Sequence, residues 1–579
     1  MRTKLSEIEN GESFDIVVIG AGGAGMSAAL FGAIQGAKVL LVEKSEYVGG
    51  TTAFSAGTTW IPNSHHAAEI GVYDDSIEKV SGYLDLAVGE HSSPLMRKAF
   101  LENGPKAIAE IEADSAVRYR ARPFHPDYIS DLNGSSLKGR ALEPLPFDGR
   151  LLGERFRLIR PPIPEFTVLG GMMVDRDDVN HLLNLTGSLT SFRHSVGLLV
   201  RHGMDRLRFQ RGTRLVMGNA LIASLLHSLD QKGVTIITEC QMDRLSSTDD
   251  GVEALELSQR GTQRHIKING GLILASGGFN RHPERRKALL PGIDPAWCPG
   301  AQGHTGQAHD VAETAGACYG KKGFSNAFWA PVSTRKREDG STAVFPHFIL
   351  DRGKPGMITV NSQGARFLNE STSYHLFGIG MQKVGVAPAY LITDADGLKK
   401  YGLGMVRPGG KGLQPFLSDG YLITGSTLTE LADRLAINAS GLQESVKRMN
   451  DYALTGDDLD YHRGTTDYQR ANGDARQSPN PNLGPIGKAP FYAVKLYPGD
   501  IGAATGFATD TQARVLNKHD APIPGLYAVG NDMHSVMGGT YPGPGITLGP
   551  GLTFAYLAAR HAVARVRALE SVAKESALA

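Results

Sequence analysis

The stretch FDIVVIGAGGAG, residues 14–25, decides the fold of this chain. Its β-branched residues predict a buried strand, and its glycines predict a tight turn that opens a helix of small apolar residues. Residues 38–42 predict a second strand, and Glu43 follows it about twenty residues after the glycines. This order of strand, glycine turn, helix, strand and acidic residue is typical of a Rossmann-like dinucleotide-binding unit.

The spacing of the glycines has a physical reason. Gly20 is expected to make the turn, Gly22 to let the backbone reach a pyrophosphate, and Gly25 to allow close packing of the helix on the strand. The helix N-terminus then faces the phosphates, and Glu43 accepts hydrogen bonds from ribose hydroxyls. The residues expected to bind the cofactor in this unit are Gly20, Gly22, Gly23, Ala24, Gly25 and Glu43.

A second cluster of glycines and hydroxyl residues follows the acidic residue. It resembles a segment of the flavoproteins of the fumarate reductase group, where it runs along the ribityl chain and the pyrophosphate. The resemblance implies FAD as the cofactor in place of NAD, although composition alone also allows a Gly-rich surface loop. The residues expected to bind FAD here are Lys44, Gly50, Thr51, Thr52, Ser55, Ala56 and Gly57.

The far end of the chain is predicted to return to the same site. Residues 270–279 and 524–531 each read as an apolar strand ending in glycine, and residues 546–568 read as a long amphipathic helix behind a glycine-rich loop. Such a loop aims backbone N–H groups at a flavin carbonyl that gains charge on reduction, although the helix can also simply pack on the sheet. The residues expected to bind the cofactor here are Ala275, Gly277, Gly530, Asn531, Gly545, Thr547 and Leu548.

With these motifs in place, nearly the whole chain resembles the 3-ketosteroid (3-oxosteroid) 1-dehydrogenases, within the fumarate reductase and succinate dehydrogenase flavoprotein group. Four segments carry the resemblance: Asp127-Tyr128 with Gly139-Arg140 and Pro146-Phe147, Arg366-Phe367-Leu368-Asn369-Glu370-Ser371 with Tyr374, Asn480-Pro481-Asn482-Leu483-Gly484-Pro485-Ile486, and Tyr541-Pro542-Gly543-Pro544-Gly545 with Thr547-Leu548-Gly549-Pro550.

The resemblance implies a reaction and four catalytic residues. The hydroxyl of Tyr541 and the N–H of Gly545 would bind a substrate ketone, and Tyr374 would remove a proton from the neighbouring carbon. Tyr128 would share its proton with Tyr374. A hydride would pass to the flavin N5, and an external acceptor such as a quinone would reoxidise the flavin.

Three alternatives stay open. Pro544 and Ile546, and Ile129-Ser130 after Tyr128, depart from the residues common in the steroid enzymes, so a smaller cyclic ketone is an alternative substrate. A fumarate or enoate reductase would need an arginine proton donor, whereas the loop before the last helix offers Tyr541 and no arginine. An electron carrier without its own substrate would not need the tyrosines.

The predicted fold class is α/β, a Rossmann-like FAD-binding domain with an inserted α+β catalytic (cap) domain. We expect residues 1–316 and 491–579 to form the FAD-binding domain and residues 317–490 to form the cap. Within the cap, residues 428–451 read as helical and residues 408–417 as a loop.

Composition limits the partners and the location. The net charge of +1 excludes an overall field for nucleic acid, and the three cysteines lack metal-ligand spacing, so we expect no metal site. No apolar run approaches the length of a membrane span, and we expect a cytoplasmic enzyme. The basic residues 193–214 read as a solvated helical face, with peripheral membrane contact as the alternative.

Overall fold

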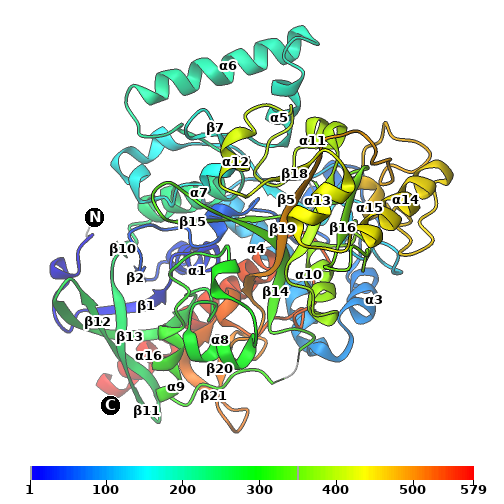
Figure 1. Ribbon diagram of the computed structural model, residues 1–579. Coiled ribbons are helices and arrows are strands. Elements are labelled where there is room, and N and C mark those ends of the chain that lie inside the picture. The colour runs from blue at the N-terminus through cyan, green and yellow to red at the C-terminus, as the bar shows by residue number, and fades with distance from the viewer. Residues whose placement is uncertain (1–2, 322, 349–350, 579) are drawn as a thin grey trace.

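A computed structural model describes residues 3–321, 323–348 and 351–578 (Figure 1). Its larger sheet has the strand order β10-β2-β1-β13-β12-β11, with β21 beside β13 and β20 beside β21. β1, β2, β10, β13 and β21 run parallel at its centre, as expected for a dinucleotide-binding unit. The strands are β1 (Ser13–Ile19), β2 (Val39–Val42), β10 (Thr235–Ile237), β11 (Gln241–Thr248), β12 (Gly251–Gln259), β13 (Thr262–Leu274), β20 (Arg514–Leu516) and β21 (Pro522–Ala528).

The glycine turn brings α1 (Gly23–Ile34) into direct contact with this sheet. Gly20 has φ +107°, and a Cβ atom there would lie 2.3 Å from the carbonyl oxygen of Ala275. A Cβ atom on Gly25 would lie 1.9 Å from the carbonyl oxygen of Gly20. Neither position has room for a side chain, which is the close approach that the spacing predicts.

The two ends of the chain meet at this sheet. β21 pairs in parallel with β13, with Leu526 opposite Leu272. The last helix, α16 (Leu548–Leu578), packs on α1, where Tyr556 lies edge-on to Phe31 with ring centroids 5.2 Å apart. Figure 1 shows this red C-terminal helix beside the blue N-terminal strands. Segments more than 500 residues apart in sequence therefore share one hydrophobic core.

A second, antiparallel sheet has the order β15-β14-β19-β17-β16, with β18 paired to β19. Its central strand, β19, follows Pro490 directly and pairs with β14 and β17. We expected the cap to end near residue 490; by sheet pairing we propose a boundary after Ala503 instead. The strands are β14 (Ala327–Lys336), β15 (Thr342–Pro346), β16 (Met357–Val360), β17 (Ala389–Thr393), β18 (Ile423–Gly425) and β19 (Phe491–Ala503).

Helices and three small sheets complete the structure, and together the layers confirm the predicted α/β class (Figure 1). The small sheets contain β3 (Thr59–Trp60), β4 (Tyr119–Ala121), β5 (Ala141–Pro144), β6 (Phe147–Asp148), β7 (Thr167–Val168), β8 (Met172–Met173) and β9 (Arg214–Leu215). The other helices are α2 (His65–Glu69), α3 (Ile77–Ala87), α4 (Pro94–Asp114), α5 (Arg176–Leu183), α6 (Leu189–Arg206), α7 (Met217–Gln231), α8 (Pro283–Leu289), α9 (Gln307–Thr314), α10 (Tyr374–Lys383), α11 (Ala395–Tyr401), α12 (Gln414–Ser418), α13 (Leu428–Leu435), α14 (Ala439–Thr455) and α15 (Asp467–Asn472). Among the described residues, none of these helices has the length and hydropathy to cross a membrane.

The helix expected over residues 428–451 is two helices. α13 ends at Leu435, and the next residue, Ala436, has φ +56°. The side chain of Asn438 then accepts a hydrogen bond from the N–H of Gly441 at 2.8 Å and caps α14. The capping residue, not the hydrophobic period, sets this break. The loop expected over residues 408–417 is also shorter, because α12 begins at Gln414.

Replacement of Gly25 by alanine tests the contact between α1 and the sheet. Because the new Cβ atom would overlap the Gly20 carbonyl, we expect the free energy of unfolding to fall by about 1–3 kcal/mol. Gly82 is the control: it lies in α3 with open space around it, so Gly82→Ala should be neutral or stabilise by up to ~1 kcal/mol. Urea unfolding of both variants measures the difference, and equal stabilities would contradict the role of Gly25.

Candidate active site

One cavity of about 1730 Å³ runs between the two sheets. It exceeds the ~300–1,000 Å³ of an ordinary small-molecule site, so it has room for a dinucleotide and a second molecule. All but one of the expected cofactor-binding residues lie on its wall: Gly20, Gly22, Gly23, Ala24, Glu43, Lys44, Gly50, Thr51, Thr52, Ser55, Ala56, Gly57, Ala275, Gly277, Gly530, Asn531, Gly545, Thr547 and Leu548.

Gly25 is the exception, because it faces the backbone of Gly20 behind the wall. Glu43 is held at the end of β2 by its own hydrogen bonds: one carboxylate oxygen accepts from the N–H of Ala21 at 2.8 Å, and the other accepts from the N–H and hydroxyl of Ser45 at 2.8 and 2.7 Å. The carboxylate therefore has a fixed orientation at the cavity wall. Direct contact of these residues with a cofactor stays a prediction.

The wall also contains a segment that we did not predict, residues 299–308. His304 is buried there and lies 3.3 Å from the hydroxyl of Thr51, and burial lowers the pKa of His304 to about 4. Lys44 donates to the side chains of Thr305 and Gln307 at 3.0 and 2.7 Å. The only sequence signal for this segment is its run of glycines at 300, 303 and 306.

The far end of the cavity fits a ring system that gains negative charge. Gly545 has φ +92°, and a Cβ atom there would lie 2.3 Å from the carbonyl oxygen of Thr58, so only glycine fits. Its N–H has no acceptor among the residues that the structure describes. Thr547 and Leu548 begin α16 at the same wall, which adds the positive end of a 31-residue helix.

The three predicted tyrosines meet beside this loop. The hydroxyl of Tyr128 donates to the hydroxyl of Tyr374 at 3.2 Å. The ring of Tyr541 stacks on that of Tyr128 at 5.5 Å and lies edge-on to Tyr374 at 5.1 Å, measured between centroids. All three line the cavity, although they come from segments more than 160 residues apart. The family resemblance implies the contact between Tyr128 and Tyr374, and the hydrogen bond between their hydroxyls agrees with it. No local sequence pattern predicts that the ring of Tyr541 stacks on that of Tyr128.

Buried charges hold Tyr128 in place. The preceding residue, Asp127, accepts from the indole N–H of Trp60 at 2.8 Å and from Arg140 at 2.6 Å. Arg140 also pairs with Asp75 at 2.6 Å, and all of these side chains are buried. The N–H of Tyr128 itself donates to the carbonyl of Pro542 at 2.8 Å, which ties it to the loop that carries Tyr541.

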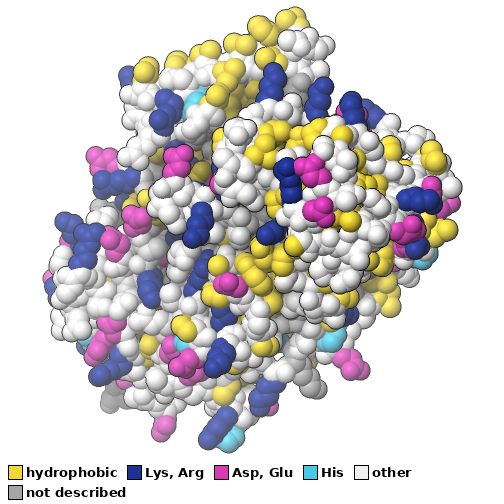
Figure 2. All heavy atoms as spheres, in the orientation of Figure 1, with side chains coloured by type: hydrophobic (Ala, Val, Ile, Leu, Met, Phe, Trp, Pro, Cys, Tyr) yellow, Lys and Arg dark blue, Asp and Glu magenta, His cyan; other side chains and the backbone are white. Residues whose placement is uncertain are grey.

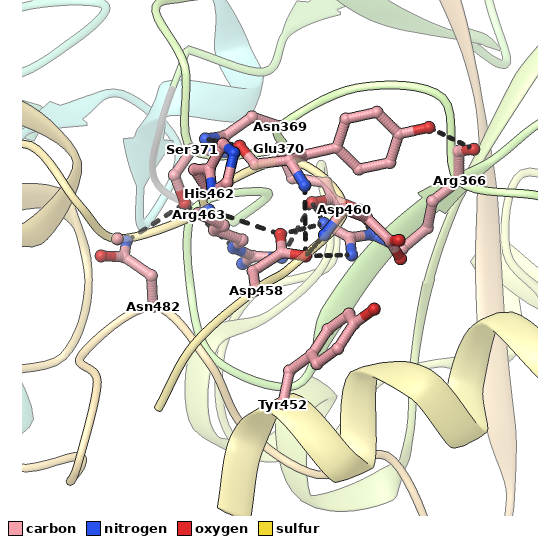
Figure 3. A network of polar contacts seen from close by, with 12 residues as sticks. Arg366, Asn369, Glu370, Ser371, Tyr452, Asp458, Asp460, His462, Arg463 and Asn482 are labelled. Atoms are coloured by element: carbon pink, nitrogen blue, oxygen red, sulfur yellow. Dashed lines mark hydrogen bonds and ion pairs between the residues drawn. The ribbon is translucent and has the colours of Figure 1, made fainter. Parts of the chain in front are cut away.

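A second ion network holds the segment before Tyr374 (Figure 3). Arg366 pairs with Glu370 at 2.7 Å and with Asp458 at 2.8 Å, and Arg463 lies 3.3 Å from the same carboxylate of Glu370. All four side chains are buried, and burial opposed by the two arginines leaves the pKa of Glu370 below its ordinary value. The RFLNES motif, residues 366–371, is thus a positioning element for α10, which begins at Tyr374.

The asparagines of the third motif, Asn480 and Asn482, join this network. The side chain of Asn482 donates to the hydroxyl of Ser371 at 3.1 Å and to the carbonyls of Gly353 and Gln469 at 2.9 and 2.8 Å. Three of the four segments that carry the resemblance therefore include residues that orient a tyrosine without touching the cavity.

Burial raises the pKa of every tyrosine in the cluster. For Tyr374 and Tyr128 the shift is large, and their neighbouring phenols add to it. The rise for Tyr541 is opposed by hydrogen bonds with Tyr374 and Thr547. The three hydroxyls are therefore protonated at neutral pH in this pocket, and the hydrogen bond from Tyr128 does not by itself ionise Tyr374.

A fourth tyrosine packs on the cluster and escaped prediction. Tyr468 is buried, its ring centroid lies 4.9 Å from that of Tyr128, and its hydroxyl has no partner among the described residues. It lies at the start of α15 in a polar stretch with no motif, so the sequence holds no signal that separates it from the other tyrosines.

One group of possible metal ligands occurs in the described part of the chain, away from the cavity wall. His65, His66 and Glu112 lie together, and His66 contacts Glu112 and Glu69 at 2.9 Å each. Burial opposes ionisation of His66, but the two carboxylates raise its pKa. Hydrogen bonds from one imidazole to two carboxylates account for this cluster.

Comparison with known proteins agrees with this geometry. A family model described as FAD binding domain matches residues 15–548. A 3-oxosteroid 1-dehydrogenase of Mycolicibacterium smegmatis is 35% identical over 95% of this chain and 97% of its own length. The chain belongs to this family of FAD-dependent dehydrogenases. It is an FAD-dependent oxidoreductase, and the cavity above is the one that fits its cofactor.

Two other relatives bear on the substrate. A 4-oxocyclohex-2-ene-1-carboxylate 5-dehydrogenase of Sinomonas cyclohexanicum is 36% identical over 94% of this chain and 93% of its own length. The crystal structure of a 3-ketosteroid Δ1-dehydrogenase from Sterolibacterium denitrificans, in complex with 1,4-androstadiene-3,17-dione, superposes with a TM-score of 0.88 at 32% identity, over 96% of this chain and 100% of that chain. The relatives thus include enzymes named for steroids and for single-ring ketones.

Replacement of Glu370 by glutamine tests the ion network before Tyr374. Because Arg463 and part of Arg366 would lose their buried counter-charge, we expect the free energy of unfolding to fall by about 3–5 kcal/mol. Glu430→Gln, which removes an exposed pair with Arg434, is the matched control and should leave the denaturation midpoint unchanged. A Glu370→Gln protein as stable as this control would show that the network does not hold the segment.

Proposed function

We propose that this enzyme introduces a ring C=C bond beside a ketone, as a 3-ketosteroid 1-dehydrogenase does. The observation that carries the proposal is the meeting of Tyr128, Tyr374 and Tyr541 with the N–H of Gly545 at one end of the cofactor cavity. Apolar walls continue from this point, through Phe328, Phe348, Phe345, Phe166, Val168 and Met405. A hydrophobic cyclic ketone matches these walls.

Each residue has a defined task in this proposal. The hydroxyl of Tyr541 and the N–H of Gly545 donate to the ketone oxygen, which acidifies the hydrogen on the adjacent ring carbon. Tyr374 accepts that proton, and the hydroxyl of Tyr128 stabilises the resulting charge through the 3.2 Å hydrogen bond. Bound FAD supplies the acceptor, N5, for the hydride from the next carbon, and an external acceptor such as a quinone then takes the electrons.

The arrangement favours desaturation over the reductive chemistry of fumarate reductases. A reductase would need an arginine free to donate a proton. Arg352 is the arginine close enough to lower the pKa of Tyr128, but its guanidinium is committed to backbone carbonyls, including those of His347, Glu370 and Thr372 at 2.9, 2.5 and 2.7 Å. Arg352 therefore holds these backbone carbonyls in place and is not free to donate a proton to a substrate.

A second candidate substrate is a single-ring ketone that carries a carboxylate. Lys354 lines the cavity, donates to the carbonyl of Gly473 at 2.7 Å and makes no ion pair with a described residue. Burial, reinforced by Arg176, lowers its pKa to about 8, so it remains mostly protonated at neutral pH. A cavity cation without an ion-pair partner among the described residues offers a carboxylate a counter-charge that a neutral steroid would not use.

Anaerobic bleaching of the bound flavin tests the reaction, because substrate oxidation must reduce the flavin before any acceptor matters. We expect 4-androstene-3,17-dione, a 5α-reduced 3-ketosteroid or 4-oxocyclohexanecarboxylate to bleach the wild-type enzyme. Tyr541→Phe removes one of two donors to the ketone and should slow bleaching by about 10²–10³-fold. A reducible flavin that no ketone bleaches would overturn the proposal.

Lys354→Met separates the two substrate classes in the same assay. If a carboxylate binds there, this variant should weaken the apparent affinity for 4-oxocyclohexanecarboxylate by about tenfold or more and leave cyclohexanone unchanged. Lys400→Met is the control, because Lys400 also lines the cavity but is already paired with Asp474 at 2.7 Å. Equal losses for both variants and both ketones would exclude a carboxylate site at Lys354.

The pH dependence tests the base. Because the pKa of Tyr374 lies above its ordinary value, its ionised fraction is small at neutral pH and increases about tenfold per pH unit. The rate of flavin bleaching by a saturating ketone should therefore rise from about pH 6.5 to pH 8.5. Tyr374→Phe should be slow and independent of pH. The same pH slope in this variant would assign the base to another residue.

A further inference from the structure

α6 is an amphipathic helix that lies with its apolar side facing outward. Large hydrophobic side chains recur at helical spacing, every three or four residues, and all are exposed. The ends of the stripe are exposed the most, with Leu189 at 82% and Leu207 at 84%. We call this set the α6 stripe: Leu189, Phe192, Val196, Leu199, Val200, Met204 and Leu207.

The inward side of α6 is polar, which fixes this orientation. Asp205 is buried and accepts from the N–H and hydroxyl of Thr213 at 2.7 and 2.8 Å. His202 is buried and hydrogen-bonds the carbonyl of Leu169 at 3.0 Å. Rotation of the helix to bury its apolar side would break these hydrogen bonds of His202 and Asp205. The stripe is therefore displayed by the structure and is not an unpacked core face.

The stripe stands out on the surface of the molecule. Figure 1 shows α6 at the top, away from both sheets, and Figure 2 shows hydrophobic side chains gathered along it. A contiguous apolar surface of this kind marks a contact with another phase or molecule. A helix of low overall hydrophobicity with one apolar side is typical of elements that lie in a membrane interface.

The charges beside the stripe select its partner. Arg193, Arg206 and Arg208 are exposed next to it, and the sequence has a single acidic residue between 189 and 208, the buried Asp205. This side of the helix is therefore positive without compensation, which complements anionic lipid headgroups. Two copies of the chain facing each other through α6 would instead bring arginine against arginine.

The stripe also adjoins the cavity. α5 packs on α6, and Val179, Asn180 and Leu182 of α5 line the cavity, as do Thr167 and Val168 of β7. The next residue, Leu169, is 64% exposed. A surface that holds α6 would thus lie against one end of the cavity.

We propose that α6 docks this enzyme on the surface of an anionic lipid bilayer. The α6 stripe enters the headgroup region, and Arg193, Arg206 and Arg208 contact lipid phosphates. The bilayer is a reservoir of apolar ketones and of quinones, and it would meet the enzyme beside its cavity. The docking itself does not depend on the proposed reaction, so the two can fail separately.

Co-flotation of the holoenzyme with lipid vesicles tests the docking. We expect binding to phosphatidylcholine vesicles that contain about one third phosphatidylglycerol, with weaker binding to pure phosphatidylcholine and at high salt. The triple variant Phe192→Ser, Leu199→Ser and Met204→Ser should partition at least about tenfold less. Arg193→Gln with Arg206→Gln should lose the preference for anionic vesicles.

Matched variants keep the test decisive. Leu454→Ser with Leu459→Ser removes two leucines that are 83% and 73% exposed elsewhere, and should bind vesicles like the wild type. In Phe192→Trp the emission should shift to shorter wavelength on vesicle addition, whereas that of Leu454→Trp should not. Flavin content and turnover of a dissolved ketone should be unchanged in all of these proteins.

Two outcomes would overturn the docking. One is flotation that the α6 variants do not reduce, or none at all for the wild type. The other is a sedimentation velocity experiment without lipid in which the wild type is a dimer and the triple serine variant a monomer, because a second copy would then cover the stripe.

Discussion

The buried ion network around Glu370 is the constraint on which the geometry of the active site depends. Arg366 and Arg463 face Glu370 and Asp458 in a region closed to water, so two positive charges meet two negative ones. Burying a charge costs free energy unless the charge is paired with good geometry. Each of the four side chains is therefore restricted to the position that keeps its ion pairs. The network therefore fixes the position of the segment that leads into α10, and so the position of Tyr374 at the start of that helix.

The same device recurs on the other side of the site. Arg140 between Asp127 and Asp75 fixes Tyr128, and the N–H of Tyr128 in turn fixes the loop of Tyr541. The hydroxyls of Tyr128 and Tyr374 share a hydrogen bond of 3.2 Å, and ring contacts join Tyr541 to both. The buried ion pairs outside the cavity therefore hold the tyrosines in place. Such supporting contacts keep a site ordered when its own residues contact one another only weakly.

The sequence predicted local features well and long-range ones poorly. The glycine turn, α1, β2 and Glu43 follow from rules that act within about thirty residues. The tyrosines were found only through family resemblance, because eighteen tyrosines carry no physical signal that singles out three. Residues 491–579 were expected to belong to the FAD-binding domain, whereas β19 pairs with strands of the second sheet; such pairing depends on partners about 100 residues or more away, which local patterns do not identify. For α6 the period indicates a helix but cannot tell which side faces the protein, and buried His202 and Asp205 decide that.

The contact between α16 and α1 has a consequence for folding during synthesis. α1 is synthesised more than 500 residues before α16, so Tyr556 can reach Phe31 only after the intervening chain has been made. Until α16 is made, the side of α1 that packs on it stays exposed, and chaperones bind exposed apolar surface of this kind. A chain shortened before α16 would therefore leave this side of α1 uncovered and would also lack Leu548, which lines the cavity.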